Sequence, residues 1–499
     1  MKPLITPSLD EFLQLAKQGN VIPVFAEFVG DSETPVSAFN KFGRYAYSFL
    51  FESTEKNDVS GRFSFIGFEP RLTVQSYGRE IHVLRNGVEE RFTTMTDPLD
   101  ELRKLMARHQ FVSRSELPRF AGGAVGFVGY EAIRFFEPKV SAARDDDLHL
   151  PEMLFMLTGN ILIFDHRLRS LKIVVNAFLD YISPEKAYAR AVASVDRIMQ
   201  QLAEPVDLPL VPLAEDENDS PPSSNLCREE FERGVQRAKE YILAGDIFQV
   251  VLSQRFESTF NGEPLDFYRC LRFINPSPYM FCLKFGDDFA LVGSSPEMHV
   301  RLVGNTIEIR PIAGTRARGL TSKQDDLNAT ELLADPKERA EHIMLVDLAR
   351  NDVGRVAEFG TVRVNEFMEI ERYSHVMHIV SNVVGRPRAD CTAFDVVRAT
   401  FPAGTVSGAP KIRAMQIISE LENVRRGCYA GAIGYFGFDG NFDSCIALRC
   451  AVLKNRKAYF QAGAGIVADS DPQREYEETV NKARAMMTAL AMANQIKTP

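Results

Sequence analysis

Two segments of the sequence carry pairs of glutamates at helical spacing, and such pairs are able to bind a hard cation. Glu338 and Glu341 are three residues apart in KERAEHIMLVDLARND, and Glu475 and Glu478 repeat the spacing in DPQREYEETVNKA. Residues three apart lie on one face of a helix, so each segment presents two carboxylates together. Mg2+ prefers oxygen ligands and commonly takes one or two protein carboxylates plus the substrate. Glutamates at this spacing are also common on solvated helix faces, so both interpretations stay open.

Two glycine-containing segments could bring backbone N–H groups close to an anion. Residues 404–411, GTVSGAPK, lack the Gly-Lys-Ser/Thr ending of a phosphate-binding loop, but a glycine-rich turn that leads into a helix still suits a carboxylate. Gly463-Ala464-Gly465 is a second such place, although glycines at a strand end often mark only a turn. Both segments are candidates for binding an anionic group.

Three further side chains could move a proton. His375 and His378 form a His-x-x-His pair, but no third nitrogen or sulfur ligand is near in sequence, so zinc is disfavoured. A buried, hydrogen-bonded histidine and a proton-transfer role both remain open. Glu297 follows GSSP as a lone acid that enters an expected strand. If the protein desolvates this carboxyl group, its pKa rises and Glu297 could serve as a general acid near neutral pH.

Short strands and amphipathic helices must position these residues. Strand pairs joined by short turns are expected at 71–76 with 80–84, 161–165 with 170–175, and 299–303 with 306–310, and Asn86-Gly87 adds another hairpin signal. Helices are expected at 184–202 after a Ser183 cap, 231–244, 329–350, 410–421 and 472–494, and strands at 247–256 and within 430–465. Because hairpins greatly outnumber strand–helix–strand units, the sequence predicts an α+β fold with mostly antiparallel sheets covered by helices.

One proline-rich, acidic segment divides the chain. Residues 204–225, EPVDLPLVPLAEDENDSPPSSN, contain five prolines and no aromatic residue. Such a segment buries too little apolar surface to order itself strongly. We therefore predict an N-terminal α+β region over 1–204, a linker over 205–225 and a C-terminal region over 226–499.

Length and composition narrow the class of protein. At about 150 residues per domain, 499 residues suggest two to four domains. The net charge of -9 disfavours nucleic acid or an anionic membrane as a partner. The sequence has neither a long apolar run nor the basic and apolar pattern of a signal peptide. Its seven scattered cysteines form no CxxC, which is typical of reduced thiols, and we expect a cytoplasmic protein.

Five short motifs occur along the chain in an order that is typical of one enzyme family. They are RPIAGT at 310–315, EH at 341–342 with LVDLARND at 345–352, GTVSGAP at 404–410, GAGIVADS at 463–470 and EYEET at 475–479. In this order they resemble the chorismate-utilising enzymes, most closely the anthranilate synthase component I family. The resemblance covers 225–499 and extends into the N-terminal half through LFES at 50–53 and GRFSFIG at 61–67. It implies a two-part chorismate-binding architecture and the Mg2+-dependent conversion of chorismate and ammonia to anthranilate and pyruvate, which begins tryptophan biosynthesis.

The resemblance also implies roles for individual residues. Glu341 and Glu478 would contact Mg2+, with Glu338 and Glu475 completing its shell. Glu297 would be the general acid and His378 would act in the aromatising elimination, with His375 as a spare candidate. Thr405 and Gln249 are grouped with the catalytic residues. The implied substrate-binding residues are Gly314, Thr315, Tyr429, Arg449, Gly463, Ala464, Gly465 and Lys482.

Two positions favour anthranilate over the products of sister reactions. Aminodeoxychorismate synthases often carry a nucleophilic lysine where this chain has Ala313, which cannot attack the ring. Isochorismate and salicylate synthases carry a base-like lysine where this chain has Gln249, a neutral amide that activates water poorly. Two alternatives stay open, which are an aminodeoxychorismate synthase component and a non-catalytic tryptophan-binding regulator on the same fold.

The resemblance further implies a partner and an inhibitor. A glutaminase usually needs an activated cysteine in Gly-x-Cys-x-Gly, and none of the seven cysteines has those flanks. We therefore expect a separate glutamine amidotransferase subunit to supply ammonia within a hetero-oligomer, a heterotetramer in this family. Tryptophan would inhibit the enzyme at an allosteric site whose residues are Glu52, Ser53, Pro278, Tyr279 and Met280, although Phe51 stands where many family members have leucine.

Overall fold

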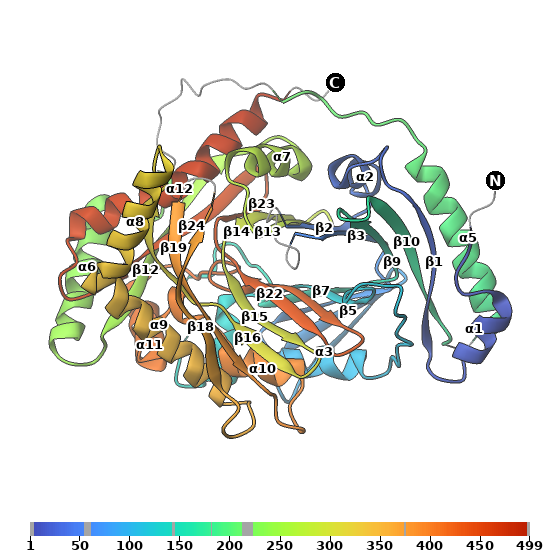
Figure 1. The fold of residues 1–499 in the computed structure, drawn as a ribbon, viewed down its shortest axis with the longest axis horizontal. Coiled ribbons are helices and arrows are strands. Elements are labelled where there is room, and N and C mark those ends of the chain that lie inside the picture. Colours follow the sequence, from blue (N-terminus) through green and yellow to red (C-terminus); the bar gives the residue numbers. More distant parts are fainter. Residues whose placement is uncertain are drawn as a thin grey trace.

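Two large sheets form the framework of the molecule, and helices cover their outer faces (Figure 1). The computed structural model describes residues 4–53, 61–141, 145–180, 182–211, 223–373 and 376–496. Within these residues, neighbouring strands of both sheets pair antiparallel. The predicted α+β fold with mostly antiparallel sheets is confirmed.

In the described part of the chain, each sheet has 12 strands. The first sheet has the spatial order β1 (Val21–Val29), β10 (Ser170–Phe178), β9 (Asn160–Asp165), β3 (Phe63–Phe68), β2 (Tyr47–Glu52), β13 (Tyr279–Phe285), β14 (Phe289–Ser295), β23 (Cys450–Lys454), β24 (Lys457–Ile466), β12 (Gln249–Thr259) and β11 (Ser223–Ser224), with β20 (Gly408–Ala409) beside β12. The second has the order β17 (Ile312–Ala317), β19 (Val376–Gly385), β16 (Thr306–Ile309), β15 (Met298–Val303), β22 (Phe442–Ile446), β21 (Ala432–Gly437), β7 (Gly123–Val128), β8 (Met153–Leu157), β4 (Leu72–Tyr77), β5 (Glu80–Arg85) and β6 (Val88–Thr93), with β18 (Arg363–Arg372) beside β19.

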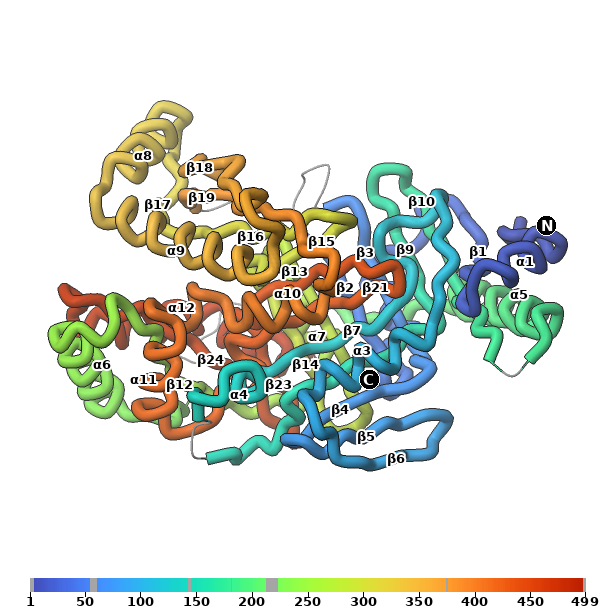
Figure 2. Tube along the Cα trace, turned by 90° about the horizontal axis from the view of Figure 1, so that it is seen from below, coloured from blue at the N-terminus to red at the C-terminus, as the bar shows by residue number. Residues whose placement is uncertain are grey.

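Helices flank these sheets on both sides (Figures 1 and 2). The α-helices are α1 (Leu9–Leu15), α2 (Pro35–Phe42), α3 (Pro98–Met106), α4 (Ile133–Phe136), α5 (Pro184–Leu202), α6 (Arg228–Leu243), α7 (Pro264–Ile274), α8 (Ser322–Ala334), α9 (Pro336–Gly354), α10 (Ala393–Thr400), α11 (Lys411–Leu421) and α12 (Pro472–Asn494), and short 3-10 helices are η1 (Tyr130–Ala132) and η2 (Gly404–Val406). None of the described helices combines the length and the apolar character needed to cross a bilayer.

The alternation of side chains along the strands creates separate apolar layers. Phe49 and Leu50 are neighbours on β2, yet Phe49 packs into the cluster between the two sheets and Leu50 into the cluster under α2, α5, α7 and α12. Successive side chains of a strand point to opposite faces, so a sheet buried on both sides reads as a continuous apolar run. A third cluster lies on the outer face of the second sheet, where α3 and α10 pack.

Both sheets continue across the predicted linker at 205–225. β2 of the N-terminal region pairs with β13 of the C-terminal region, and β7 pairs with β21. At the end of the linker, β11 pairs with β12, whereas residues 212–222 lie outside the described part of the chain. The two regions therefore share one framework, and N-terminal strands support the sheets that carry the C-terminal site residues.

The predicted helices are confirmed, and the helical region predicted over 329–350 contains parts of two helices. α8 ends at Ala334 and α9 begins at Pro336, with Asp335 between them. Pro336 has no N–H to continue the hydrogen bonds of α8, and proline is well suited to the first position of a new helix. The Asp335 carboxylate accepts the backbone N–H groups of Lys337 at 2.9 Å and Glu338 at 3.2 Å. This restart sets the direction in which α9 presents its glutamates.

Candidate active site

Glu297 lies in the connection between β14 and β15, and its carboxyl group is held against η2. Thr405 on η2 donates its hydroxyl to Glu297 Oε1 at 2.8 Å. Burial raises the pKa of Glu297 to about 7, while the Thr405 hydrogen bond and the positive charges of Lys482 and Arg449 act in the opposite direction. A carboxyl group with this pKa can donate a proton near neutral pH, which is the behaviour expected of a desolvated Glu297.

His378 lies on β19 opposite Thr315 of β17. Its Nδ1 atom is 3.0 Å from the carbonyl oxygen of Gly314 and 3.1 Å from Thr315 Oγ1. A carbonyl oxygen only accepts hydrogen bonds, so the neutral imidazole carries its proton on Nδ1 and keeps a lone pair on Nε2. Burial lowers the pKa of His378, and the charge of Arg449 lowers it further. The side chain is therefore neutral near neutral pH and able to accept a proton at Nε2.

Gly314 lies between His378 and Glu338, one of the predicted metal ligands. Its φ is +68° at an irregularity in the pairing of β17 with β19, and a Cβ there would lie 3.0 Å from Glu338 Oε2. Glycine is the residue that adopts positive φ without a steric penalty and that leaves room for this carboxylate. The carbonyl group that orients His378 thus lies beside a predicted metal ligand.

Arg449 lies between β22 and β23 in an unusual backbone conformation. Its φ is +46°, a region that residues other than glycine seldom occupy and that is common at functional sites. Its carbonyl oxygen accepts the N–H of Ser294 on β14 at 3.0 Å. The surrounding protein lowers the pKa of the guanidinium, and the charge of Glu297 opposes that shift. Arg449 affects the pKa values of both Glu297 and His378, so its guanidinium lies within electrostatic range of the acid and of the imidazole.

The Gly463-Ala464-Gly465 segment lies inside β24, with one edge paired to β12. On its other side, β23 pairs only with residues 457–460 of β24 among the described strand pairs. Backbone groups at Gly463–Gly465 that point toward that side therefore make no ladder bonds with β23. A strand edge that ends its pairing in this way can offer N–H groups to an anionic ligand.

Three predicted site residues pack closely against Gly463 and Gly465. A Cβ on Gly463 would lie 2.7 Å from the Tyr429 hydroxyl, and a Cβ on Gly465 would lie 2.6 Å from Gln249 Nε2. Lys482 donates from Nζ to the Gly463 carbonyl oxygen at 2.9 Å. The two glycines are thus required for close packing, and they bring Tyr429, Gln249 and Lys482 to one stretch of backbone.

The four predicted metal ligands lie on α9 and α12, on the same side of the molecule (Figures 1 and 2). Burial raises the pKa of Glu341, and the charges of Glu338 and Glu478 raise it further. Burial also raises the pKa of Glu475, with a smaller contribution from Glu478. Since Glu478 on α12 affects Glu341 on α9, the two helices bring their carboxylates within electrostatic range. A divalent cation would relieve this repulsion, so the oxygen-only donor set suits Mg2+.

The described carboxylates do not form a complete metal-binding site in this structure. Glu338 accepts a hydrogen bond from Arg316 Nη1 at 3.0 Å, and Glu478 pairs with Lys482 at 2.6 Å. Among the described residues, no three ligating side chains are close enough together to hold a metal ion without rearrangement. The assignment of Mg2+ to these four glutamates therefore stays a prediction.

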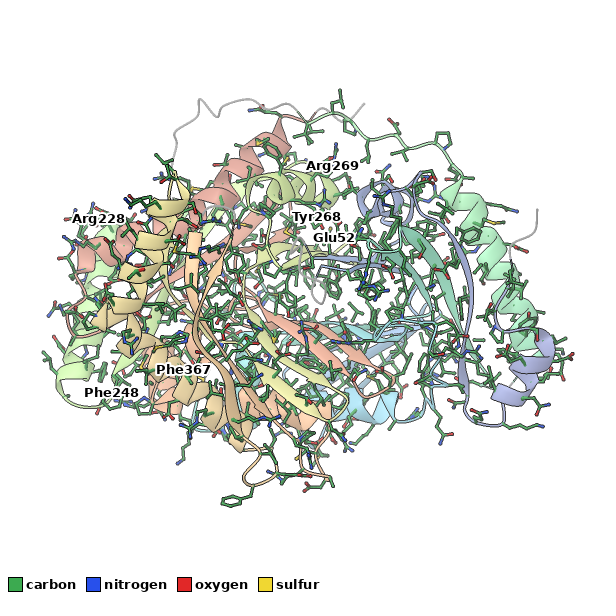
Figure 3. The ribbon with its side chains drawn as sticks, viewed as in Figure 1. Glu52, Arg228, Phe248, Tyr268, Arg269 and Phe367 are labelled. Atoms are coloured by element: carbon green, nitrogen blue, oxygen red, sulfur yellow. The ribbon has the colours of Figure 1, made fainter. Side chains whose placement is uncertain are left out.

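The residues predicted to bind tryptophan come together from distant parts of the chain. Glu52 on β2 lies directly opposite Met280 on β13. The Glu52 carboxylate accepts a hydrogen bond from Tyr268, which lies beside it (Figure 3). It also pairs with Arg272 Nε at 3.2 Å. Tyr279, next to Pro278, donates its hydroxyl to Asp443 at 3.1 Å.

Two buried polar atoms at this place make no hydrogen bond with any residue that the structure describes. They are Ser53 Oγ at the end of β2 and Asn275 Nδ2 at the end of α7. A buried polar group without a partner is costly, and a ligand that supplies the missing hydrogen bonds would remove that cost. Both atoms therefore support a binding function for this region.

One predicted proton-transfer residue lies outside the described part of the chain, and one buried ion pair was not among the predicted site residues. His375 lies outside the described residues. Glu422 and Arg426 form an ion pair at 2.6 Å, and both side chains are almost completely buried. Their i, i+4 spacing is visible in the sequence, but it ordinarily indicates a pair on the surface of a helix. These two residues instead follow the end of α11.

The fold, together with Glu297, His378 and Arg449, defines a class of enzyme. The sequence profile of the family described as chorismate binding enzyme matches residues 46–488, a range that includes every predicted site residue. Because this match covers most of the chain, the protein belongs to the chorismate-binding enzymes.

Within this family the chain is similar along nearly its whole length to proteins named anthranilate synthase component 1. It is 48% identical over 496 residues to the one from Acetivibrio thermocellus, covering 98% of this chain and 99% of the relative. It is 47% identical to the one from Aquifex aeolicus, covering 98% of both. The solved structure of anthranilate synthase component I from Streptococcus pneumoniae has a TM-score of 0.74 at 38% identity and covers 92% of this chain and 98% of its own. The isochorismate synthase MenF of Escherichia coli has a TM-score of 0.70 at 19% identity, covering 97% and 99%, a likeness of fold alone.

Proposed function

We propose that this chain converts chorismate and ammonia to anthranilate and pyruvate, the first step of tryptophan biosynthesis. The observation that carries the proposal is the buried Glu297, which Thr405 binds at 2.8 Å and whose pKa of about 7 suits a general acid beside the cation of Arg449. The reaction named for the full-length relatives requires such an acid, because a hydroxyl group must leave the ring.

Chorismate carries two carboxylates, and the site offers a separate position for each. The enolpyruvyl carboxylate would bind the Arg449 guanidinium and the backbone N–H groups of Gly463–Gly465, with Tyr429 and Lys482 beside them. The ring carboxylate would face the glutamates of α9 and α12. Glu341 and Glu478 would hold Mg2+ there, with Glu338 and Glu475 acting through water. When bound, the cation supplies the positive charge that lets an anionic ring approach anionic side chains.

In the first step, ammonia adds at ring C2 while the hydroxyl at C4 leaves. Glu297 donates its proton to the C4 oxygen as the C4–O bond breaks, so water leaves instead of hydroxide. The new C2–N bond forms as the ring double bonds shift toward C4. Thr405 keeps the carboxyl group of Glu297 in place during this transfer. The product is aminodeoxyisochorismate.

In the second step, His378 removes the proton at C2. Its Nδ1–H donates to the Gly314 carbonyl, so the lone pair on Nε2 is the one that accepts this proton. The electrons released at C2 make the ring aromatic while the C3–O bond breaks and the enolpyruvyl group leaves. The leaving group is the enolate of pyruvate, which takes up a proton at its CH2 carbon to give pyruvate, and anthranilate remains.

A separate subunit would supply the ammonia. The pKa of every cysteine thiol in the chain is raised, to about 11 for Cys270 and about 12 for Cys282 and Cys450. A glutaminase cysteine needs a lowered pKa, because the thiolate is the nucleophile. The word component in the relatives' names also suggests a partner. We infer a glutamine amidotransferase subunit, bound in a cytoplasmic hetero-oligomer.

One assay tests the proposed reaction and its ammonia source together. The purified chain, given chorismate, Mg2+ and an ammonium salt at alkaline pH, should form fluorescent anthranilate. Glutamine in place of ammonium should give no product until an amidotransferase subunit is added. Glutamine-dependent turnover by the isolated chain would contradict the partner, and aminodeoxychorismate as the product would contradict the reaction.

We further propose that tryptophan inhibits the enzyme at the site of Glu52, Ser53, Pro278, Tyr279 and Met280. The unpartnered Ser53 Oγ and Asn275 Nδ2 support a polar ligand there. The ladder between β2 and β13 keeps the two halves of the site in register.

Replacing Ser53 with phenylalanine should remove tryptophan sensitivity and leave catalysis intact. The phenyl ring would add bulk at the place where Ser53 Oγ is buried, and the substitution leaves Glu297 and His378 themselves unchanged. The chain contains no tryptophan, so the fluorescence of added tryptophan reports binding without background from the protein. Wild type should change this fluorescence and the variant should not. A variant that is still inhibited as wild type would contradict the site.

A further inference from the structure

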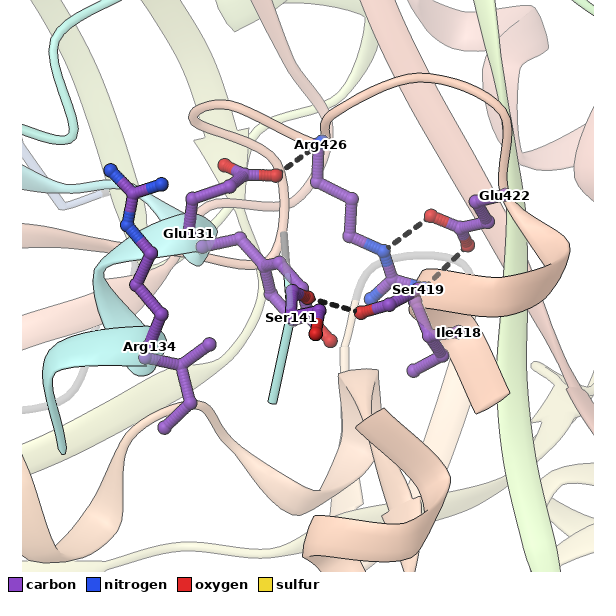
Figure 4. Close-up of a pocket in the computed structure, with 9 residues that line it drawn as sticks. Glu131, Arg134, Ser141, Ile418, Ser419, Glu422 and Arg426 are labelled. Atoms are coloured by element: carbon purple, nitrogen blue, oxygen red, sulfur yellow. Dashed lines mark hydrogen bonds and ion pairs between the residues drawn. The ribbon is translucent and has the colours of Figure 1, made fainter. Parts of the chain in front are cut away.

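Arg426 is a buried residue whose guanidinium group donates hydrogen bonds to Glu422 and to two segments of backbone, and Figure 4 shows its side chain beside Glu422. Its Nε and Nη2 atoms donate to the two carboxylate oxygens of Glu422 at 2.8 and 2.6 Å. Its Nη1 atom donates to the carbonyl oxygen of Val406 at 2.8 Å, and Nη2 donates to that of Val251 at 2.8 Å. A single side chain therefore ties two separate backbone segments to one carboxylate.

Both of those backbone segments carry proposed active-site residues. Val406 directly follows Thr405 on η2, whose hydroxyl binds Glu297. Val251 on β12 lies opposite Gly465 in the ladder with β24. The guanidinium also lies 5.5 Å from the ring centre of Tyr429, three residues along the chain. Arg426 thus contacts the backbone beside Thr405, which binds the general acid, and the strand that pairs with the glycine segment. It also contacts the ring of Tyr429.

The environment of Arg426 is itself fixed. The Glu422 carboxylate accepts both the N–H and the hydroxyl of Ser253, at 2.9 and 2.7 Å. The backbone N–H of Arg426 donates to Glu131 at 2.8 Å, and the Tyr130 ring lies 4.7 Å from the guanidinium on its other side. A cation held by this many partners has little freedom to move, which is what precise placement of a neighbouring loop requires.

Stability alone is a poor explanation for this pair. Two charges lose their hydration when they are buried, and the Coulomb attraction between them often only offsets that loss. A pair of apolar side chains could fill the same volume at similar stability, but it could not bind the Val406 and Val251 carbonyls. The contacts to these carbonyls are therefore the better guide to what Arg426 does.

We propose that Arg426, fixed by Glu422, is a positioning residue that holds Thr405 against Glu297 and keeps the Gly463–Gly465 backbone and Tyr429 in place. The inference rests on the proposed anthranilate-forming activity. Arg426 contacts neither of the proposed proton-transfer side chains, so it acts through the backbone that carries them.

The test is Arg426→Lys in the full chain, assayed for ammonium-dependent anthranilate formation. Lysine keeps the positive charge against Glu422, but its single nitrogen cannot bind both carbonyls and both carboxylate oxygens. We expect kcat to fall by about 100-fold, the effect typical of a small displacement near reacting groups. Arg413→Lys is the matched control, because Arg413 lies on α11, forms a forked pair with Asp246 and is partly exposed. Its activity should equal that of wild type.

A double-mutant cycle with Thr405→Val separates positioning from a general loss of structure. If Arg426 acts in part through Thr405, the loss caused by Arg426→Lys should be clearly smaller in the Thr405→Val background than in the wild type, because the first change has already removed that contact. Fully multiplicative losses, or a loss in Arg426→Lys no larger than in Arg413→Lys, would overturn the proposal. Thermal melts identify an unfolded variant, and Glu422→Gln then decides by the same cycle. Wild type without anthranilate formation would instead overturn the proposed function.

Discussion

Glu297→Gln is expected to lower the rate of anthranilate formation by about 10²–10⁴-fold, the usual contribution of a positioned general acid. Glutamine has nearly the same shape and can still accept the Thr405 hydrogen bond, but it cannot release a proton to the C4 oxygen. The measurement is kcat with chorismate, Mg2+ and a constant concentration of free ammonia. Glu257→Gln is a suitable control, since Glu257 pairs with Lys457 on an exposed part of β12.

The pH dependence of the same assay identifies the group. Glu297 must be protonated to act, so kcat/KM in the wild type should fall as pH rises through about 7, the pKa of this residue in the free enzyme. The glutamine variant should lack this decrease. A variant that keeps wild-type activity or the same decrease would assign the general acid to another residue.

Glu297→Gln should also leave the fold intact, because the raised pKa makes the native carboxylate unfavourable. In the unfolded chain this group titrates at its ordinary value of 4.5, whereas in the folded chain its pKa is about 7. The folded state therefore binds the proton more tightly, and this group lowers the free energy of unfolding as pH rises between those two values. The variant loses that penalty, so its melting temperature above neutral pH should equal or exceed that of the wild type.

Glu341→Gln and Glu478→Gln are each expected to weaken Mg2+ binding by about 100-fold or more, since even residues that only orient metal ligands contribute 10–100-fold. Each change removes one of two carboxylates that α9 and α12 bring within electrostatic range. Calorimetric titration with MgCl2 and the Mg2+-dependent shift in melting temperature measure binding without relying on activity. Glu477→Gln, a neighbouring exposed position on α12, should bind Mg2+ as wild type does.

The state without Mg2+ gives an independent check. Burial and the charges of Glu338 and Glu478 raise the pKa of Glu341, so glutamine at this position removes a repulsive charge. In the presence of a chelator, Glu341→Gln should therefore melt at the same or a higher temperature than wild type. Unchanged Mg2+ affinity in both variants would contradict the assignment of these ligands.

Local sequence patterns predicted individual elements well, because their causes are local. Ser183 caps α5 and accepts the N–H of Lys186, and α12 has the predicted bounds of 472–494. The helical region predicted over 329–350 contains parts of α8 and α9, and Asp335-Pro336 marks the point where the first helix ends and the second begins. The predicted boundary at 205–225 gave no indication that β2 and β7 pair with strands from beyond it, since strand pairing across hundreds of residues has no local signal.

The sequence by itself determined which chemical groups are available, which are a lone acid after GSSP, a histidine, an arginine, two pairs of glutamates and a glycine segment in a recognisable order. Only the tertiary structure decided their properties. Burial beside η2 raises the pKa of Glu297 to about 7, and the Gly314 carbonyl selects which nitrogen of His378 carries the proton. In the folded chain, Glu422 and Arg426 form a buried ion pair. The glutamates of α9 and α12 lie within electrostatic range of one another, but among the described residues they do not form a complete metal site. The physical reason is that pKa values, tautomers and burial depend on neighbours in space, which residue types and spacing along the chain do not specify.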